Sequence, residues 1–179
     1  MTDQILLEIV TPAGRALEAH VDEVTAPSID GEFGVLPGHL PLLAALKTGI
    51  VTYRKGSETT RVAVGPGFAE AGPDRLVILT EEYAERAQID PVVVRKELAE
   101  AQAELAKLEG VPIVSIEARG GAQSEVDARV QREAWIGKEN WLATKLDLYG
   151  DPPPATQRPF EAYGAVPPPA EDEVPLASE

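Results

Sequence analysis

The first half of the chain alternates short apolar runs with polar turns, and this pattern predicts strands. Aliphatic runs at residues 5–10, 59–64 and 75–80 are bounded by clusters of Gly, Pro and Asp. Residues 55–58 separate two such runs in the manner of a hairpin loop. About eight to ten short strands with regularly spaced turns are typical of an all-β sandwich or barrel. We therefore expect a β-sandwich domain over residues 1–88.

The hydrophobic period changes at residue 89 and predicts two helices. Asp90 suits the N-cap of a helix and Pro91 its first turn. Apolar residues then recur at spacings of three and four, at Val94, Leu98, Ala101, Leu105 and Leu108. A second helix is expected from Ser124 to Gly150. The sequence thus predicts an antiparallel helical hairpin over residues 89–149.

Two segments fit neither pattern. Residues 110–123 form an apolar linker that either adds a strand or covers an apolar patch. Residues 150–179 are rich in proline and acidic residues, a composition that cannot bury a core, so a disordered, partly polyproline-II tail is expected. The predicted fold class is therefore α+β: a β-sandwich or barrel first, then the helical hairpin, then the Pro-rich tail.

Charge and composition narrow the classes of partner. The net charge is −14, with 30 acidic and 16 basic residues, so a nucleic-acid partner is not expected and an anionic membrane surface would repel the chain. With two histidines and no cysteine, neither a metal site nor a disulfide is expected. We predict no cofactor. Neither a signal peptide nor a run of about 18 apolar residues is visible, so direct membrane insertion is not expected.

The strongest motif lies at residues 30–43, which read DGEFGVLPGHLPLL, followed by LKTG at 46–49. This stretch resembles the signature of bacterial F-type ATP synthase epsilon subunits. Residues 65–71 and 80–90 resemble a later hairpin of that family and its passage from the last strand to the first helix. Order and spacing agree over residues 1–109. The chain departs from the family pattern in three features: a linker longer than the family's usual connection, the tryptophans at positions 135 and 141, and the Pro-rich tail.

The resemblance implies a non-catalytic rotor subunit of the proton-translocating synthase, at the cytoplasmic face of the bacterial inner membrane. In the family, the sandwich packs on the gamma subunit and its tip loops touch the c-ring. The hairpin either folds onto the sandwich or extends toward the alpha and beta subunits, where it opposes ATP hydrolysis. By position, the resemblance puts the c-ring contact at Asp30, Gly31 and Glu32, and His39 near the ring or the gamma interface.

A nucleotide site of the family is only partly matched. Epsilon subunits that bind ATP resemble one another at a motif of Ile or Leu, Asp, two variable residues, Arg and Ala. Ile89 and Asp90 match, but Val93 stands at the arginine position and Arg95 comes two residues late. We therefore expect no ATP binding.

Two other functions compete with the rotor assignment. One is a free-standing interaction module that serves another complex. The other is a small hydrolase that uses paired acids, Asp30 with Glu32 or Glu81 with Glu82. The sequence offers no nucleophile and base in a recognisable arrangement, which counts against the hydrolase.

Overall fold

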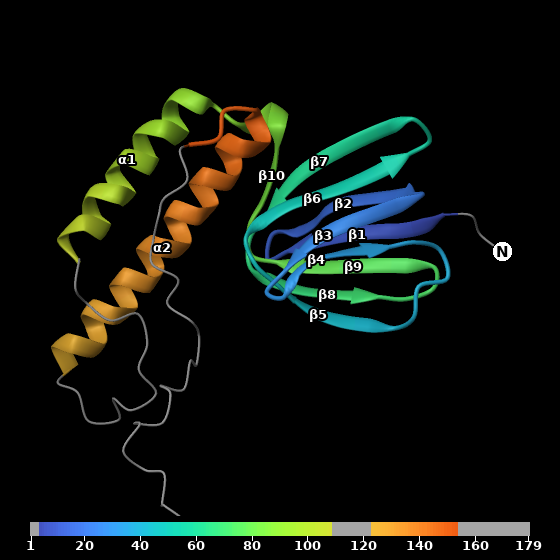
Figure 1. Ribbon diagram of the computed structural model, residues 1–179, viewed down its shortest axis with the longest axis horizontal. Coiled ribbons are helices and arrows are strands. Elements are labelled where there is room, and N and C mark those ends of the chain that lie inside the picture. Colours follow the sequence, from blue (N-terminus) through green and yellow to red (C-terminus); the bar gives the residue numbers. More distant parts are fainter. Residues whose placement is uncertain (1–3, 109–122, 154–179) are drawn as a thin grey trace, which may run out of the picture.

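A computed structural model of the chain describes residues 4–108 and 123–153, without the side chains of residues 123–126. Within these residues, ten strands precede a 3-10 turn and two α-helices, as Figure 1 shows, and this confirms the predicted fold class. The strands are β1 (Ile5–Thr11), β2 (Gly14–Val21), β3 (Glu23–Ser28), β4 (Gly31–Val35), β5 (Leu42–Leu46), β6 (Gly49–Lys55), β7 (Glu58–Val64), β8 (Gly67–Ala71), β9 (Arg75–Thr80) and β10 (Tyr83–Glu85). The helical elements are η1 (Arg86–Gln88), α1 (Pro91–Lys107) and α2 (Gln123–Tyr149).

The strands form one sheet that folds back on itself as a sandwich. Their order is β10-β7-β6-β3-β5-β8-β9-β1-β2, with β4 paired to β3. Strands β3 and β5 share only the pair Ser28 and Leu46, so the sheet bends there. A first layer, β10-β7-β6-β3-β4, then faces a second layer, β5-β8-β9-β1-β2, across the core (Figure 1).

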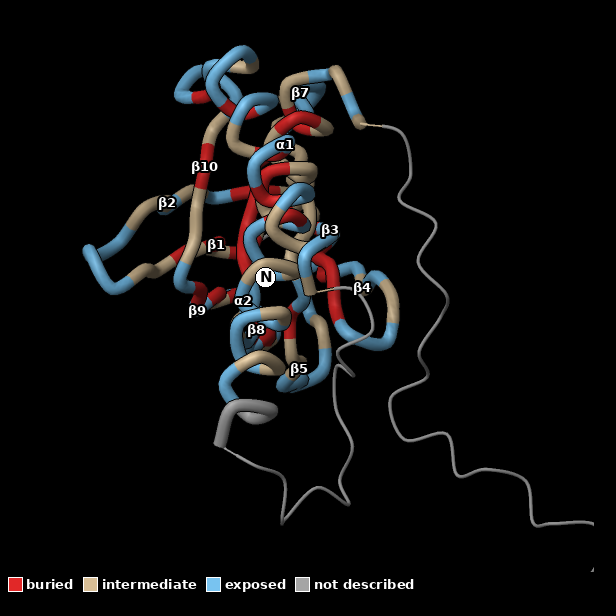
Figure 2. Tube along the Cα trace, turned by 90° about the vertical axis from the view of Figure 1, so that its left-hand side faces the viewer, coloured by how far each residue is buried: buried red, intermediate tan, exposed pale blue. Residues whose placement is uncertain are grey.

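The core fills the space between the layers with aliphatic side chains. Alternate residues of the strands point inward, which produces the alternation of buried and exposed positions in Figure 2. Val24, Val51 and Val62 come from the first layer, and Leu7 and Ile78 come from the second. All five are at most 2% exposed. Small aliphatic residues therefore supply this core.

The two helices lie side by side, and the end of α2 lies beside η1, which connects β10 to the start of α1 (Figure 1). The Asp90 side chain accepts hydrogen bonds from the backbone N–H groups of Val92 and Val93, at 2.9 and 3.4 Å, so it caps α1 as predicted. Val94, Leu98 and Ala101 of α1 are buried against α2, which confirms most of the predicted apolar seam.

Some sequence expectations differ from the structure or lie outside it. The β6–β7 loop contains two residues between the paired Lys55 and Glu58, because these two residues themselves pair in the ladder. Trp135 and Trp141, which depart from the family pattern, are both half-buried against the hairpin core. The linker predicted at 110–123 lies outside the described residues except for Gln123, which begins α2, and the tail predicted at 150–179 lies outside them from residue 154 onward.

Candidate interaction site

The two outer faces of the sandwich differ in what covers them. On the first layer, Ile50, Ala63 and Ala84 are neighbours on adjacent strands and point away from the core. All three pack against leucines of α2, namely Leu142, Leu146 and Leu148, in one cluster. The hairpin therefore covers this face with apolar contact.

The outer face of the second layer carries large apolar residues that no described segment of the chain covers. Phe68 of β8 lies opposite Ala45 of β5 and Leu79 of β9. One row further along, Leu43 of β5 lies opposite Glu70. Phe68 is 58% exposed, Leu79 52% and Leu43 72%. We call Leu43, Ala45, Phe68 and Leu79 the outer apolar face.

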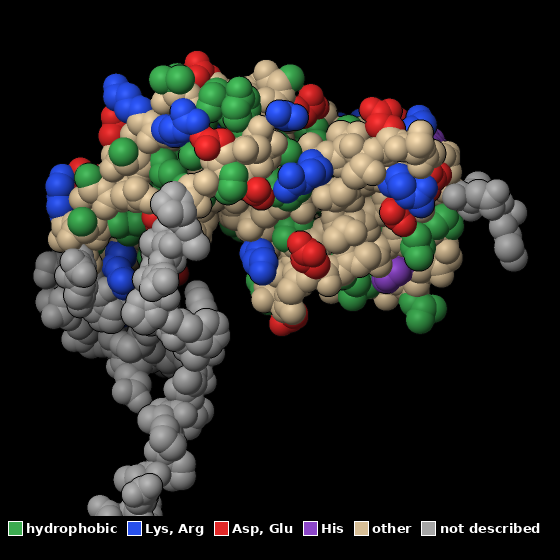
Figure 3. Space-filling model, turned by 45° about the horizontal axis from the view of Figure 1, so that its top comes forward, with side chains coloured by type: hydrophobic (Ala, Val, Ile, Leu, Met, Phe, Trp, Pro, Cys, Tyr) green, Lys and Arg blue, Asp and Glu red, His purple; other side chains and the backbone are tan. Residues whose placement is uncertain are grey.

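The segment that leads into β5 extends this apolar exposure. Leu36 and Leu40 are 54% and 80% exposed, and Figure 3 shows hydrophobic side chains at the end of the molecule remote from the helices as well as over the helices. A cluster of large exposed apolar residues on a folded chain marks a surface that another molecule covers. The second layer thus presents a docking surface where the first layer carries its own hairpin.

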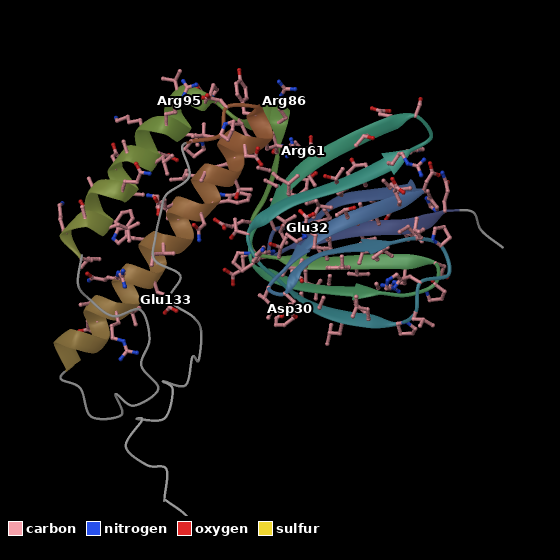
Figure 4. All side chains as sticks on the ribbon, viewed as in Figure 1. Asp30, Glu32, Arg61, Arg86, Arg95 and Glu133 are labelled. Carbon is pink, nitrogen blue, oxygen red and sulfur yellow. The ribbon has the colours of Figure 1, made fainter. Side chains whose placement is uncertain are left out.

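The acidic turn between β3 and β4 holds three residues assigned to the c-ring contact. Gly31 has φ of 131°, a backbone conformation that glycine adopts and other residues rarely do. The N–H of Asp30 donates to the Ser28 hydroxyl oxygen at 3.2 Å, which fixes the turn. Asp30 and Glu32 are both exposed. Figure 4 shows Asp30 at the tip of the turn and Glu32 further along β4, where it lines a groove of about 740 Å³ beside α2.

His39 is not part of that turn. It lies in the segment before β5, whose first residue Leu42 pairs with Ala71, whereas the β3–β4 turn adjoins the last residue of β5, Leu46. The N–H of Gly38 donates to the Pro73 carbonyl at 2.7 Å and ties this segment to the β8–β9 turn. The length of β5, about 14 Å for five residues, therefore separates His39 from the acidic turn.

The residues of the partial nucleotide motif are all engaged in holding the hairpin. Ile89 is 8% exposed in the hairpin cluster, and Asp90 caps α1. The Arg95 guanidinium pairs with Asp151 just beyond the end of α2, with Nε at 2.8 Å from Oδ2. A pocket of about 370 Å³ lies beside this motif, and Val93 and Trp141 form part of its wall.

The paired acids show no arrangement suited to hydrolysis. Asp30 lies at the tip of the β3–β4 turn and Glu32 two residues on in β4, and of the two only Glu32 lines the groove beside α2, so they do not face each other across a cleft. Burial raises the pKa of Glu82, an effect that Lys145 opposes and Glu81 reinforces. Within the described part of the chain, no three His, Cys, Asp or Glu residues gather as metal ligands, and neither helix is long and apolar enough to cross a membrane.

The sequence interpretation missed the outer apolar face. Its signal was present in residues 67–71, where Phe68 and Glu70 alternate with the small Ala69 and Ala71. Alternation alone does not say which face is buried, and here the alanines point into the core. The larger side chain, Phe68, is consequently the one that remains outside.

Comparison with known proteins agrees with this arrangement. Residues 4–87 match the family described as ATP synthase, Delta/Epsilon chain, beta-sandwich domain. The ATP synthase epsilon chain 2 of Syntrophotalea carbinolica is 43% identical over 108 residues, which are 60% of this chain and 78% of that one. The epsilon chain of Anoxybacillus flavithermus is 47% identical over 100 residues, 56% of this chain and 73% of that one.

The fold also resembles a chain in the structure of the Euglena gracilis mitochondrial ATP synthase OSCP/F1/c-ring. The TM-score is 0.60 at 22% identity, over 80% of each chain. The matched β-sandwich domain assigns residues 4–87 to the delta/epsilon class of ATP synthase chains. Within that class, the chain belongs to the ATP synthase epsilon chain family. Members of this family are non-catalytic subunits of the synthase.

Proposed function

We propose that the chain works in the central stalk of a bacterial proton-translocating ATP synthase, where it couples rotation of the c-ring to the catalytic head. The observation that carries this proposal is the uncovered outer apolar face, on a chain whose family consists of subunits of a larger complex. The proposed location is peripheral, at the cytoplasmic face of the inner membrane.

The outer apolar face is the proposed contact with the gamma subunit. Full burial of a large apolar side chain stabilises an interface by about 1.5–3 kcal/mol. Phe68, Leu79 and Leu43 are each more than half exposed, so a partner can still cover most of their surface. Glu70, next to Leu43 on the same face, supplies a polar margin. An apolar centre with a polar rim is the usual composition of a protein interface.

The acidic turn is the proposed contact with the c-ring. Asp30 and Glu32 place two exposed carboxylates on a turn whose backbone is fixed by Gly31 and by the bond to Ser28. Such charges favour orientation and rapid encounter with a polar loop more than they add affinity. His39 stands at the other end of β5, next to the exposed Leu40, so we assign it to the gamma contact and not to the ring.

The hairpin is the proposed regulatory part. It lies against the first layer here, and an extended form would contact the alpha and beta subunits conditionally. Removing residues 110–179 from the chain in the assembled enzyme tests this role by ATP hydrolysis. Faster hydrolysis supports inhibition by the hairpin, and an unchanged rate contradicts it.

The assignment to the complex is tested by affinity capture of tagged full-length chain from lysate, with mass spectrometry. Gamma, alpha and beta subunits in fixed ratio support the proposal. A chain that is recovered without them, under conditions that keep the synthase intact, supports the free-standing interaction module. Hydrolytic turnover by the purified chain that is lost on Glu32→Gln or Glu81→Gln would support the hydrolase.

A further inference from the structure

Three arginines from three different elements converge on the C-terminal end of α2. Figure 4 shows Arg61, Arg86 and Arg95 around this end of the helix. Arg61 of β7 pairs with Asp147 at 3.4 Å between Nη2 and Oδ2. We call this set the arginine clamp; its contacts are Arg61 with Asp147, Arg86 with Tyr149, and Arg95 with Asp151.

The other two contacts of the clamp involve Tyr149 and Asp151, two and four residues after Asp147. The Arg86 guanidinium lies over the Tyr149 ring, with Cζ 5.7 Å from the ring centroid, a cation–π arrangement. Arg95 of α1 holds Asp151 through both Nε and Nη2. The clamp therefore ties the end of α2 to the first layer of the sandwich, to η1 and to α1.

The end of α2 is built to reach these partners. Gly150 has φ of 102°, and the N–H groups of Gly150 and Asp151 both donate to the Leu146 carbonyl. This glycine-terminated turn reverses the chain direction directly after the helix. Asp151 is thereby brought back toward the first turns of α1, where it meets Arg95.

The apolar contact beneath the clamp is shallow. On the sandwich side it consists of Ile50 and of two small residues, Ala63 and Ala84, which pair across β7 and β10 and lie under the leucines of α2. Alanine methyl groups bury little area and offer no pocket that would fix the position of a helix. The position of α2 on the sandwich must therefore be fixed by the ion pairs and the cation–π contact at the edge of this surface. Arg61 is two residues from Ala63 on the same face of β7, at the right place to do so.

We propose that the arginine clamp is an intrachain latch, which holds the hairpin against the sandwich without any bound ligand. The latch is a property of the isolated chain. Its consequence for the enzyme rests on the proposed function, because there the hairpin would have to open the latch in order to extend.

The latch is tested by measuring exposure of the surface under α2. The chain contains no cysteine, so Ala63→Cys introduces a single thiol that α2 covers. Ala69→Cys, in the core between the layers, is the matched control, because its position is 1% exposed and is not covered by the hairpin. In full-length chain, adding Arg61→Gln and Arg95→Gln should accelerate labelling at position 63 by about tenfold. Labelling at position 69 should not change.

Charge exchange and salt give independent readouts. Exchanging the pair by Arg95→Asp with Asp151→Arg should restore slow labelling at position 63, whereas Arg95→Asp alone should not. Moderate salt should accelerate labelling with the clamp intact and have little effect without Arg61 and Arg95. Arg15→Gln, which removes an arginine of β2 paired with Glu18, is the control for general loss of charge.

The same labelling assay has two outcomes that would contradict the latch. One is labelling at position 63 that stays slow without the arginines, and another is equal acceleration at positions 63 and 69. If Ala63→Cys itself loosens the chain, hydrogen exchange at the amides of β7 and the end of α2 replaces the thiol readout, with the same expectations. None of these measurements involves the synthase, so a failed latch and a failed capture of gamma are distinguishable.

Discussion

Phe68 and Leu79 lie directly opposite each other on β8 and β9, and more than half of each side chain faces solvent. On the other layer, the corresponding outward pair Ala63 and Ala84 is buried under α2. The outward side chains of the two layers therefore differ in size. Small residues lie where the chain covers itself, and large apolar residues lie where it does not. This asymmetry supports the proposal that a partner covers the second layer.

Replacing Phe68 and Leu79 together by Gln should reduce capture of the gamma subunit by about tenfold or more, because two central apolar contacts are lost. The free energy of unfolding of the isolated chain should change by less than about 1 kcal/mol, since neither side chain contributes to the core. Val92→Gln, at an exposed apolar position of α1, is the matched control. Unimpaired capture with the double variant would place the gamma contact elsewhere.

Gly67 is required by a close approach of two backbones. A Cβ at this position would lie 1.9 Å from the Leu79 carbonyl oxygen, and that backbone atom cannot move aside as a side chain does. Gly67→Ala should therefore destabilise the chain by about 2–4 kcal/mol in urea unfolding. Gly72→Ala, where the nearest atom is 3.9 Å away, should cost much less. Equal effects of the two changes would mean that the β8–β9 pairing relaxes freely.

Local chemistry made much of this fold predictable. Asp90 caps α1 through hydrogen bonds to residues two and three positions on, and such short-range signals are visible in sequence. The strands were likewise visible as alternating runs. The family resemblance then added the expected role of the residues in the acidic turn.

Long-range pairing was not predictable. Arg61 and Asp147 are 86 positions apart, and Arg95 and Asp151 are 56 apart, so no local pattern connects them. The resemblance left His39 near either the ring or the gamma interface, and only the pairing of β5 shows that the length of this strand separates His39 from the acidic turn. Residues that are close in sequence lie far apart in space when an extended strand runs between them.

Glu82 should make the chain less stable at neutral pH than an uncharged residue would. Burial raises the pKa of its carboxyl, against the attraction of Lys145 and with the repulsion of Glu81. Because the folded chain holds the proton more tightly, the stability from this group is present below its unfolded pKa and is lost as the pH rises through the folded pKa.

Glu82→Gln removes that loss, so the variant should unfold at higher urea concentration at pH 7 and at the same concentration as the original chain well below pH 4.5. Glu81→Gln, at an exposed neighbouring position, should produce a smaller change. A destabilising effect of Glu82→Gln at pH 7 would show that the charged form, attracted by Lys145, is the one the fold prefers.

Asp22 should show the opposite dependence on pH. Its Oδ1 accepts from the Gln4 amide at 3.0 Å and its Oδ2 from the Gly56 N–H at 2.6 Å. These hydrogen bonds, and then the charge of Arg54, lower its pKa, and a hydrogen bond and charge from Arg54 lower the pKa of Glu23. Stability from these carboxylates is present above their unfolded pKa and is lost as the pH falls through the lower folded values.

Asp22→Asn should therefore destabilise the chain at pH 7, and the difference from the original chain should shrink as the pH falls below about 4. Arg54→Gln is the informative companion, because it weakens the stabilisation of both Asp22 and Glu23 through their shared partner, 3.2 and 2.9 Å away. Urea unfolding from pH 7 to pH 3 measures all three chains. If the differences persist undiminished at pH 3, the contribution of Asp22 comes from hydrogen-bond geometry alone and not from its charge.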